Sequence, residues 1–122
     1  MNCQEKTQYY LDRIAKYNSK LNCFLTVCEE EAVAGAKAAD ERRAKKQSLG
    51  ALDGMPIALK DIFVTAGIKT TCGSKILHNY IPPYDGTTAS ALKKAGAVLL
   101  GKLNLDEFAM GSSNEFSGFG PV

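Results

Sequence analysis

The sequence predicts an α/β fold in which two helices come before a parallel or mixed β-sheet. Residues 4–21 and 28–46 show helical patterns, whereas residues 55–59 and 97–101 are short apolar runs typical of buried strands. A third helical pattern separates the two apolar runs. Parallel strands need a crossover connection of a dozen or more residues, so residues 55–101 are interpreted as a strand, an excursion, a helix and a second strand.

The first two elements are predicted to be helices with one buried face each. In the first helix, apolar side chains recur at spacings of four, three and four and so line one face: Tyr10, Ile14, Tyr17 and Leu21. The second helix is rich in strong helix formers and has a narrow face suited to close packing, formed by Ala32, Ala36 and Ala39. Residues 22–26 are predicted to be a break between them, and residues 47–54 a loop.

Turn and cap signals define the rest of the chain. Glycine, asparagine and proline punctuate residues 65–84, which predicts irregular structure. Asp85 or Thr87 is expected to cap the next helix, and Gly96 to mark its end. The buried face of that helix is expected to consist of Ala89, Leu92 and Ala95. The glycine- and serine-rich residues 108–122 predict a loop.

Length, charge and cysteine content restrict the function classes. The 122 residues suffice for one domain, and a net charge of +2 is too small to indicate nucleic acid or a membrane. The basic run 42–46 is interpreted as a solvated helix end, and no segment approaches the ~18 apolar residues of a membrane helix. No CxxC pair is present, and His78 has no cysteine neighbour at metal spacing, so no metal site is expected. Free thiols and the lack of a secretory segment predict a cytoplasmic protein.

Lys60 is the most informative candidate residue because it lies within an apolar stretch, residues 55–64. Lysine is rarely buried unless it is paired, and burial lowers the pKa of a lysine toward neutrality. A lysine that is neutral near pH 7 can act as a general base. Alternatively, the strand ends at Leu59, and Lys60 and Asp61 form a solvated charged pair. The residues by themselves leave both interpretations open.

Several motifs resemble the amidase signature family. The stretch Leu52-Asp-Gly-Met-Pro-Ile-Ala-Leu-Lys-Asp61 is similar to the lysine motif of that family. Further similar stretches are Asp85-Gly-Thr-Thr-Ala89, Gly96-Ala-Val98, Gly101-Lys-Leu-Asn-Leu-Asp-Glu-Phe-Ala-Met-Gly-Ser-Ser-Asn-Glu115 and Phe119-Gly-Pro-Val122. The resemblance covers residues 8–122, and its most specific run, 101–115, resembles the glutamine-hydrolysing subunits of tRNA-dependent amidotransferases.

The resemblance implies a fold and a site. The fold would be the N-terminal part of an amidase-signature α/β/α sandwich with a mixed β-sheet. Residues 1–122 would form the N-terminal fragment of a single amidase domain, with a helical leader over 1–50 and the start of the sheet core over 51–122. Family members cleave amides with a Ser–cis-Ser–Lys triad, and Lys60 matches the lysine base. The loop that borders the substrate pocket is matched by Met110, Gly111, Ser112 and Ser113.

The two serines of the family triad lie in a Gly-Ser-rich stretch that has no counterpart in residues 1–122. None of the serines that follow Lys60 in the sequence is therefore expected to be the nucleophile: Ser74, Ser90, Ser112, Ser113 and Ser117. Adjacent strand residues point to opposite faces, so Asp61 is expected to make structural hydrogen bonds or to cap a helix rather than to pair with Lys60.

The resemblance also implies a function for the complete protein, which would hydrolyse glutamine and supply ammonia for the amidation of Glu-tRNA(Gln) or Asp-tRNA(Asn). It implies no cofactor on this chain, ATP and Mg²⁺ on a partner subunit, B- and C-type subunits as partners, and indirect contact with tRNA. Two alternatives remain open, a stand-alone amidase for another small amide and a non-catalytic fragment. The fragment alone is expected to be inactive and to expose a sheet edge and an apolar patch.

Overall fold

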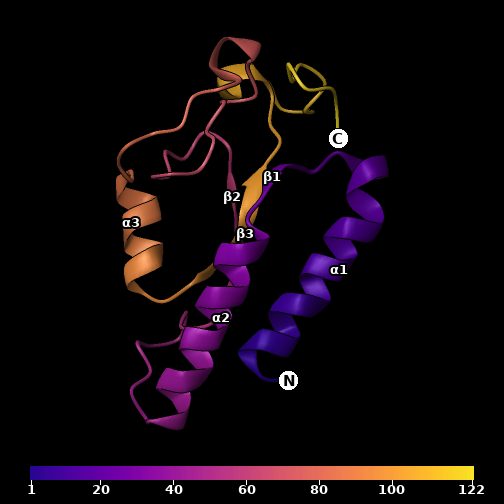
Figure 1. Ribbon diagram of the computed structural model, residues 1–122. Helices are drawn as coiled ribbons and strands as arrows, with labels where there is room; N and C mark the ends of the chain where they lie inside the picture. Colours follow the sequence, from indigo (N-terminus) through magenta and orange to yellow (C-terminus); the bar gives the residue numbers. More distant parts are fainter.

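A mixed three-stranded sheet forms the centre of the computed structural model, which describes all residues, 1–122 (Figure 1). The elements in chain order are α1 (Cys3–Leu21), β1 (Phe24–Val27), α2 (Glu29–Ala44), β2 (Pro56–Lys60), α3 (Thr87–Lys94) and β3 (Val98–Leu103), with 3₁₀ turns at Lys75–Leu77 and Glu107–Ala109. The strand order is β1-β3-β2, and β3 runs antiparallel to β1 and parallel to β2. The predicted α/β class and the parallel crossover are confirmed.

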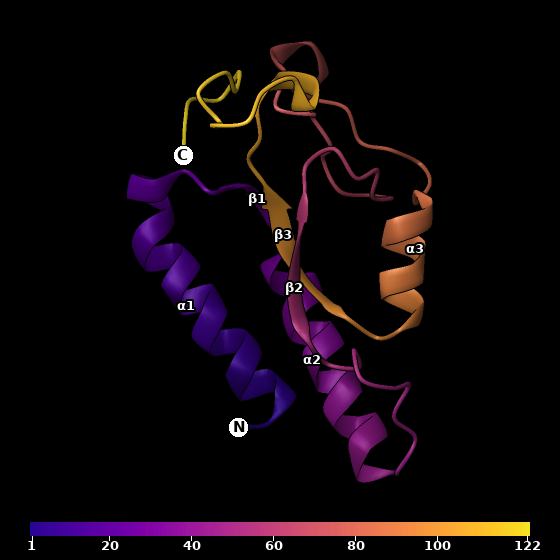
Figure 2. The same ribbon diagram turned by 180° about the vertical axis from the view of Figure 1, so that it is seen from behind.

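The helices lie on both sides of this sheet. Helix α1 packs against α2 and α2 packs against β3, whereas α3 lies on the opposite side of the sheet from α1 in both views (Figures 1 and 2). The core consists of small and branched side chains from these elements: Cys3, Leu11, Ala32, Ala36, Ala39, Val98 and Leu100. The three alanines have no exposed surface, which confirms the narrow packing face predicted for α2.

The buried face of α1 differs from the prediction. The buried residues are Cys3, Thr7 and Leu11, whereas Tyr10, Tyr17 and Leu21 are 43%, 38% and 51% exposed. The exposed three, together with Phe24, Leu100 and neighbouring side chains, line an apolar groove between α1 and β1. The sequence pattern identified an apolar stripe correctly, but it could not show that α2 would cover the adjacent face instead.

Strand β1 lies where a break was predicted, and this prediction is wrong. The break is confined to the end of α1, where Asn22 takes a left-handed conformation with φ of 50°. The four residues of β1 then pair with β3 through Phe24–Leu103 and Val27–Gly101. A side chain at Gly101 would collide with the Thr26 carbonyl oxygen, so glycine permits the close approach of β1. Pairing with a strand distant in sequence decided the local structure.

The end of α3 agrees with the prediction, but its start does not. Gly96 follows the helix with a φ of +77°, as expected for a residue that ends a helix. The N-cap is Gly86, which provides no side-chain cap. Asp85 instead lies 2.8 Å from the Lys93 ammonium and accepts a hydrogen bond from the Ala66 N–H. Of the predicted buried face, only Ala89 is fully buried; Leu92 and Ala95 are half-buried.

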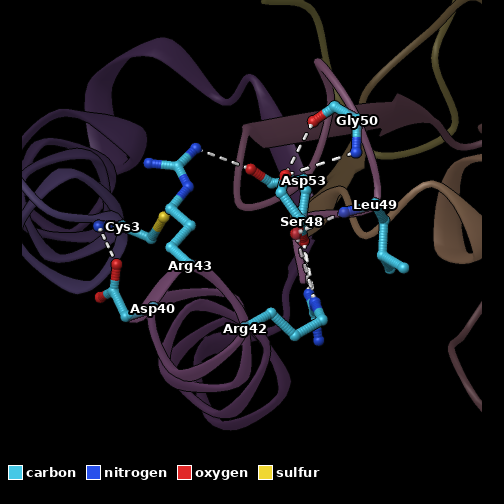
Figure 3. Close-up of polar contacts among 8 residues, drawn as sticks. All are labelled: Cys3, Asp40, Arg42, Arg43, Ser48, Leu49, Gly50 and Asp53. Atoms are coloured by element: carbon cyan, nitrogen blue, oxygen red, sulfur yellow. Dashed lines mark hydrogen bonds and ion pairs between the residues drawn. The ribbon is translucent and has the colours of Figure 1, made fainter. Parts of the chain in front are cut away.

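A polar network fastens the end of α2 to the loop that leads into β2 (Figure 3). The Asp53 carboxylate is fully buried and accepts hydrogen bonds from the Arg42 guanidinium and the Leu49 N–H. Arg43 donates to the Asp53 carbonyl oxygen over 2.8 Å. The hydrogen bond from Arg42 lowers the pKa of Asp53 to about 2. Arg42 is thus paired with a buried acid, and the interpretation of this basic run as a solvated helix end is wrong for Arg42.

Candidate active site around Lys60

Lys60 is the last residue of β2, and its side chain is exposed. Its neighbours Leu59 and Asp61 are both buried, as expected for alternation along a strand. The apolar surroundings in the sequence therefore belong to the other face, and of the two interpretations left open, the structure of residues 1–122 agrees with a solvent-exposed Lys60 side chain. The strand does not stop at Leu59 either, because Lys60 pairs with Leu103 of β3.

A polar cavity at the end of the two parallel strands contains the Lys60 side chain. The loop after β3 supplies the other walls, and the lining residues are Lys60, Asn104, Leu105, Asp106, Ala109, Gly111, Ser112 and Asn114. Because β2 and β3 are parallel, their carboxyl ends meet at one edge of the sheet, where both loops emerge. In Figure 2 the C-terminal segment lies beyond this edge.

Only two of the four residues of the predicted pocket loop line the cavity. Gly111 and Ser112 line the cavity together with Lys60. Met110 is 79% exposed, and the Ser113 hydroxyl donates to the Glu115 carboxylate over 2.6 Å; neither lines the cavity. The structure therefore places two of the four loop residues beside the lysine.

Asp106 shapes this loop, although sequence reasoning did not single it out. Its carboxylate is buried and accepts hydrogen bonds from the backbone N–H groups of Asn114, at 2.9 Å, and Phe116, at 2.8 Å. A side chain at Gly111 would overlap the Asp106 carboxylate, so the loop can close over Asp106 only because residue 111 is glycine. The available signal was an acidic residue next to the apolar Leu105 in a strand-to-loop position.

Asn104 ties the same loop to the rest of the chain. Its side-chain amide donates to the carbonyl oxygens of Asn22 and Gly120, at 3.0 and 2.9 Å, and its oxygen accepts from the Ser117 hydroxyl. A buried amide with three partners on two segments is expected to hold them in one arrangement. Asn104 thus fixes one wall of the cavity.

Asp61 makes the structural hydrogen bonds that were predicted for it. Its Oδ2 accepts from the backbone N–H and the hydroxyl of Thr71. Its Oδ1 lies 3.1 Å from the Lys102 ammonium, in an ion pair whose angles fall outside those of a hydrogen bond. Lys102 and Asp61 both have no exposed side-chain surface. Asp61 does not pair with Lys60.

The serines of the chain do not supply a partner for Lys60. Ser74 donates to Glu107 and Ser117 to Asn104, while Ser113 donates to Glu115. No hydrogen bond or ion pair engages the Lys60 ammonium. The site therefore presents a primary amine in a polar cavity, which is suited to proton transfer once a nucleophile is brought beside it.

The acidic, cysteine and histidine side chains are spread over the molecule. No group of three or more His, Cys, Asp or Glu side chains is arranged to hold a metal ion. The four cysteines are all free, and Cys3 and Cys28 are buried. Among the helices, none has the length and apolarity needed to cross a membrane.

Comparison with known proteins agrees with the motifs. The amidase family profile matches residues 5–122. The chain is 59% identical over 118 residues to the A-type subunit of glutamyl-tRNA(Gln) amidotransferase from Geobacter metallireducens, and 58% identical over 118 residues to that from Coxiella burnetii. These matches cover 97% of this chain but 24% of each relative. The chain therefore spans about a quarter of the length of these curated relatives.

Solved structures share the fold. A peptide amidase from Stenotrophomonas maltophilia is 32% identical with a TM-score of 0.88, and the match covers 99% of this chain and 26% of that one. The A-type subunit of glutamyl-tRNA(Gln) amidotransferase from Thermotoga maritima is 34% identical with a TM-score of 0.76, covering 98% and 24%. The strand order, the helices on both sides of the sheet and the profile match lead to one conclusion. The chain belongs to the amidase family.

Proposed function

We propose that residues 1–122 carry the lysine base of an amidase that hydrolyses glutamine and delivers ammonia for tRNA-dependent amidation. The observation that supports this most strongly is the identity of 59% over 118 residues to the A-type subunit of a glutamyl-tRNA(Gln) amidotransferase. The run 101–115 forms the wall of the cavity that faces Lys60, so the most specific sequence similarity lies at the candidate site itself.

In this proposal Lys60 takes the proton that a serine hydroxyl must lose before it attacks the amide carbon. A serine hydroxyl is a weak nucleophile and needs an adjacent base. The nucleophilic serine and the bridging serine would come from chain outside residues 1–122, and the open polar cavity around Lys60 is where they would enter. Ammonia would leave as the acyl-enzyme forms, and water would then release glutamate.

The remaining parts of the proposal concern other molecules. B- and C-type subunits would be partners, one partner would use ATP and Mg²⁺ to activate the carboxylate of misacylated Glu-tRNA(Gln) or Asp-tRNA(Asn), and this chain would contact tRNA only indirectly. This chain would bind no cofactor. The free thiols fit the reducing cytoplasm in which such a complex would work.

A stand-alone amidase is the second candidate, supported by the fold shared with the peptide amidase. A substrate panel separates the two. The complete protein with its partner subunits should release ammonia from glutamine with a higher kcat/KM than from simple aliphatic amides. The absence of glutamine turnover alongside hydrolysis of aliphatic amides would reject the proposal in favour of the second candidate.

A non-catalytic fragment is the third candidate, supported by the Lys60 side chain having no serine partner within residues 1–122. The intact mass of the natural product discriminates it from the other two. A mass near the 13.1 kDa of the 122 residues, with no amide hydrolysis, would favour the fragment. A larger mass with a Gly-Ser-rich continuation would favour the amidase.

A further inference from the structure

Lys102 is the one lysine of the chain that is fully buried, and its ammonium makes two hydrogen bonds and one ion pair. The ammonium donates to the Phe63 carbonyl oxygen and the Thr70 hydroxyl oxygen, each at 2.9 Å, and lies 3.1 Å from Asp61 Oδ1. An ammonium has three donors; two of them are hydrogen-bonded here, and the carboxylate beside the third compensates the charge. Lysine is almost never buried without such partners. The surrounding side chain and backbone groups therefore stabilise the charged form of Lys102 in the protein interior.

Two of the three partners of Lys102, Asp61 and Phe63, lie in the turn that begins at Lys60. The Phe63 N–H donates to the Lys60 carbonyl oxygen over 3.0 Å, which closes a turn over residues 60–63. Lys102 contacts the second residue of this turn through the Asp61 carboxylate and the fourth through the Phe63 carbonyl. The Asp61 N–H in turn donates to the Leu103 carbonyl oxygen. One buried cation thus holds the chain immediately after Lys60.

Lys102 makes no direct contact with Lys60. Lys102 pairs with Leu59 in the parallel ladder, whereas Lys60 pairs with Leu103. Side chains at neighbouring positions of a strand point to opposite faces, so the two ammonium groups lie on opposite faces of the sheet. The Lys60 ammonium has no hydrogen bond of its own. Its location in the cavity is therefore set by its backbone.

We propose that the buried Lys102–Asp61 pair is a positioning device that fixes the turn after Lys60 and thereby the placement of the Lys60 amine in the cavity. The role assigned to Lys60 as a base rests on the proposed function. The positioning itself does not, because the pair and the turn lie within residues 1–122 and can be tested without any substrate. In this proposal Lys102 is a positioning residue, and it does not line the cavity that contains Lys60.

Hydrogen exchange and lysine labelling of the 122-residue chain test the proposal with three variants. Lys102→Met removes the cation and leaves Asp61 unpaired, which can unfold the chain. The double variant Asp61→Asn, Lys102→Met leaves no buried charge at this site and should keep the fold while losing the contacts to the turn. Lys69→Met removes an exposed lysine next to Thr70 and is the matched control.

In the double variant the Phe63 amide should exchange on the order of tenfold faster than in the unmodified chain, with the amides of α1 unchanged. The rate of Lys60 acetylation should change, and that of Lys94 in the same chain should not. Lys69→Met should match the unmodified chain in both readouts.

Four results would overturn the proposal. If the Phe63 amide of the double variant exchanged as slowly as in the unmodified chain, the pair would not hold the turn. A faster exchange without any change in Lys60 labelling would reduce the pair to a structural role. Loss of protection across all helices in the double variant would mean that the pair supports the whole sheet. An unprotected Phe63 amide in the unmodified chain would mean that the turn is not held at all.

Discussion

The replacement Asp53→Asn tests how the loop before β2 is held in place. Asp53 has no exposed side-chain surface, and its pKa falls from the ordinary 3.8 to about 2 because Arg42 hydrogen-bonds the carboxylate. At about 1.4 kcal/mol per pKa unit, the ionised carboxylate contributes about 2 kcal/mol to folding at neutral pH. The pKa in the folded state lies below that in the unfolded state. The contribution is therefore fully present above the unfolded value and is lost as pH falls through about 2.

Urea unfolding at pH 7 and near pH 2 measures this contribution. At pH 7 the variant should be less stable than the unmodified chain by about 2 kcal/mol, and near pH 2 the difference should shrink below about 1 kcal/mol. Asp12→Asn, at an exposed position of α1, is the control and should change stability by less than about 0.5 kcal/mol. A difference that is equal at the two pH values, or absent at pH 7, would refute the reasoning.

Three further predictions concern the cavity loop, the thiols and the apolar groove. Gly111→Ala should force the loop away from the Asp106 carboxylate and destabilise the chain by about 1 kcal/mol or more, measured by thermal unfolding; an unchanged melting temperature would contradict this. Burial raises the pKa of the Cys28 thiol to about 11, which leaves about one thiolate in a thousand at pH 8. Mass mapping after brief alkylation should therefore find Cys23 modified before Cys28. The reverse order would be inconsistent with the structure. Because the groove lined by Tyr17 and its neighbours is open, the isolated chain should bind an apolar dye, and Tyr17→Ser should weaken that binding; equal binding by the variant would place the dye elsewhere.

The elements with strong local signals were predictable from the sequence. Ala32, Ala36 and Ala39 gave the correct face of α2 because a narrow alanine stripe permits only close packing. Gly96 marked the end of α3 because only glycine adopts its positive φ without strain. Strand β1 could not be predicted, since its four residues are a strand only through pairing with β3.

The candidate site shows the same division between local signals and tertiary contacts. Lys60 was identified by its resemblance to a family motif. The physical criteria used for Lys60, burial and pairing within an apolar run, are met instead by Lys102. A lysine within an apolar run is expected to be paired, and in the run that ends at Leu103 Lys102 is both buried and paired. Sequence spacing could not show which lysine faces the cavity, because the bulges in the pairing of β3 decide which side chains share a face. Asp106 was missed because its partners are backbone N–H groups eight and ten residues further along.

The central claim is that Lys60 is the base of a glutamine-hydrolysing amidase. The most direct measurement is ammonia release from glutamine by the complete protein with its partner subunits, compared between the unmodified protein and its Lys60→Met variant. Lys60 is exposed at a strand end and holds no other side chain, so the variant should fold and assemble normally. We expect a loss of kcat of about 10²- to 10⁴-fold, as is typical for removal of a general base. Glutamine hydrolysis at an unreduced rate by a folded, assembled Lys60→Met protein would contradict the claim.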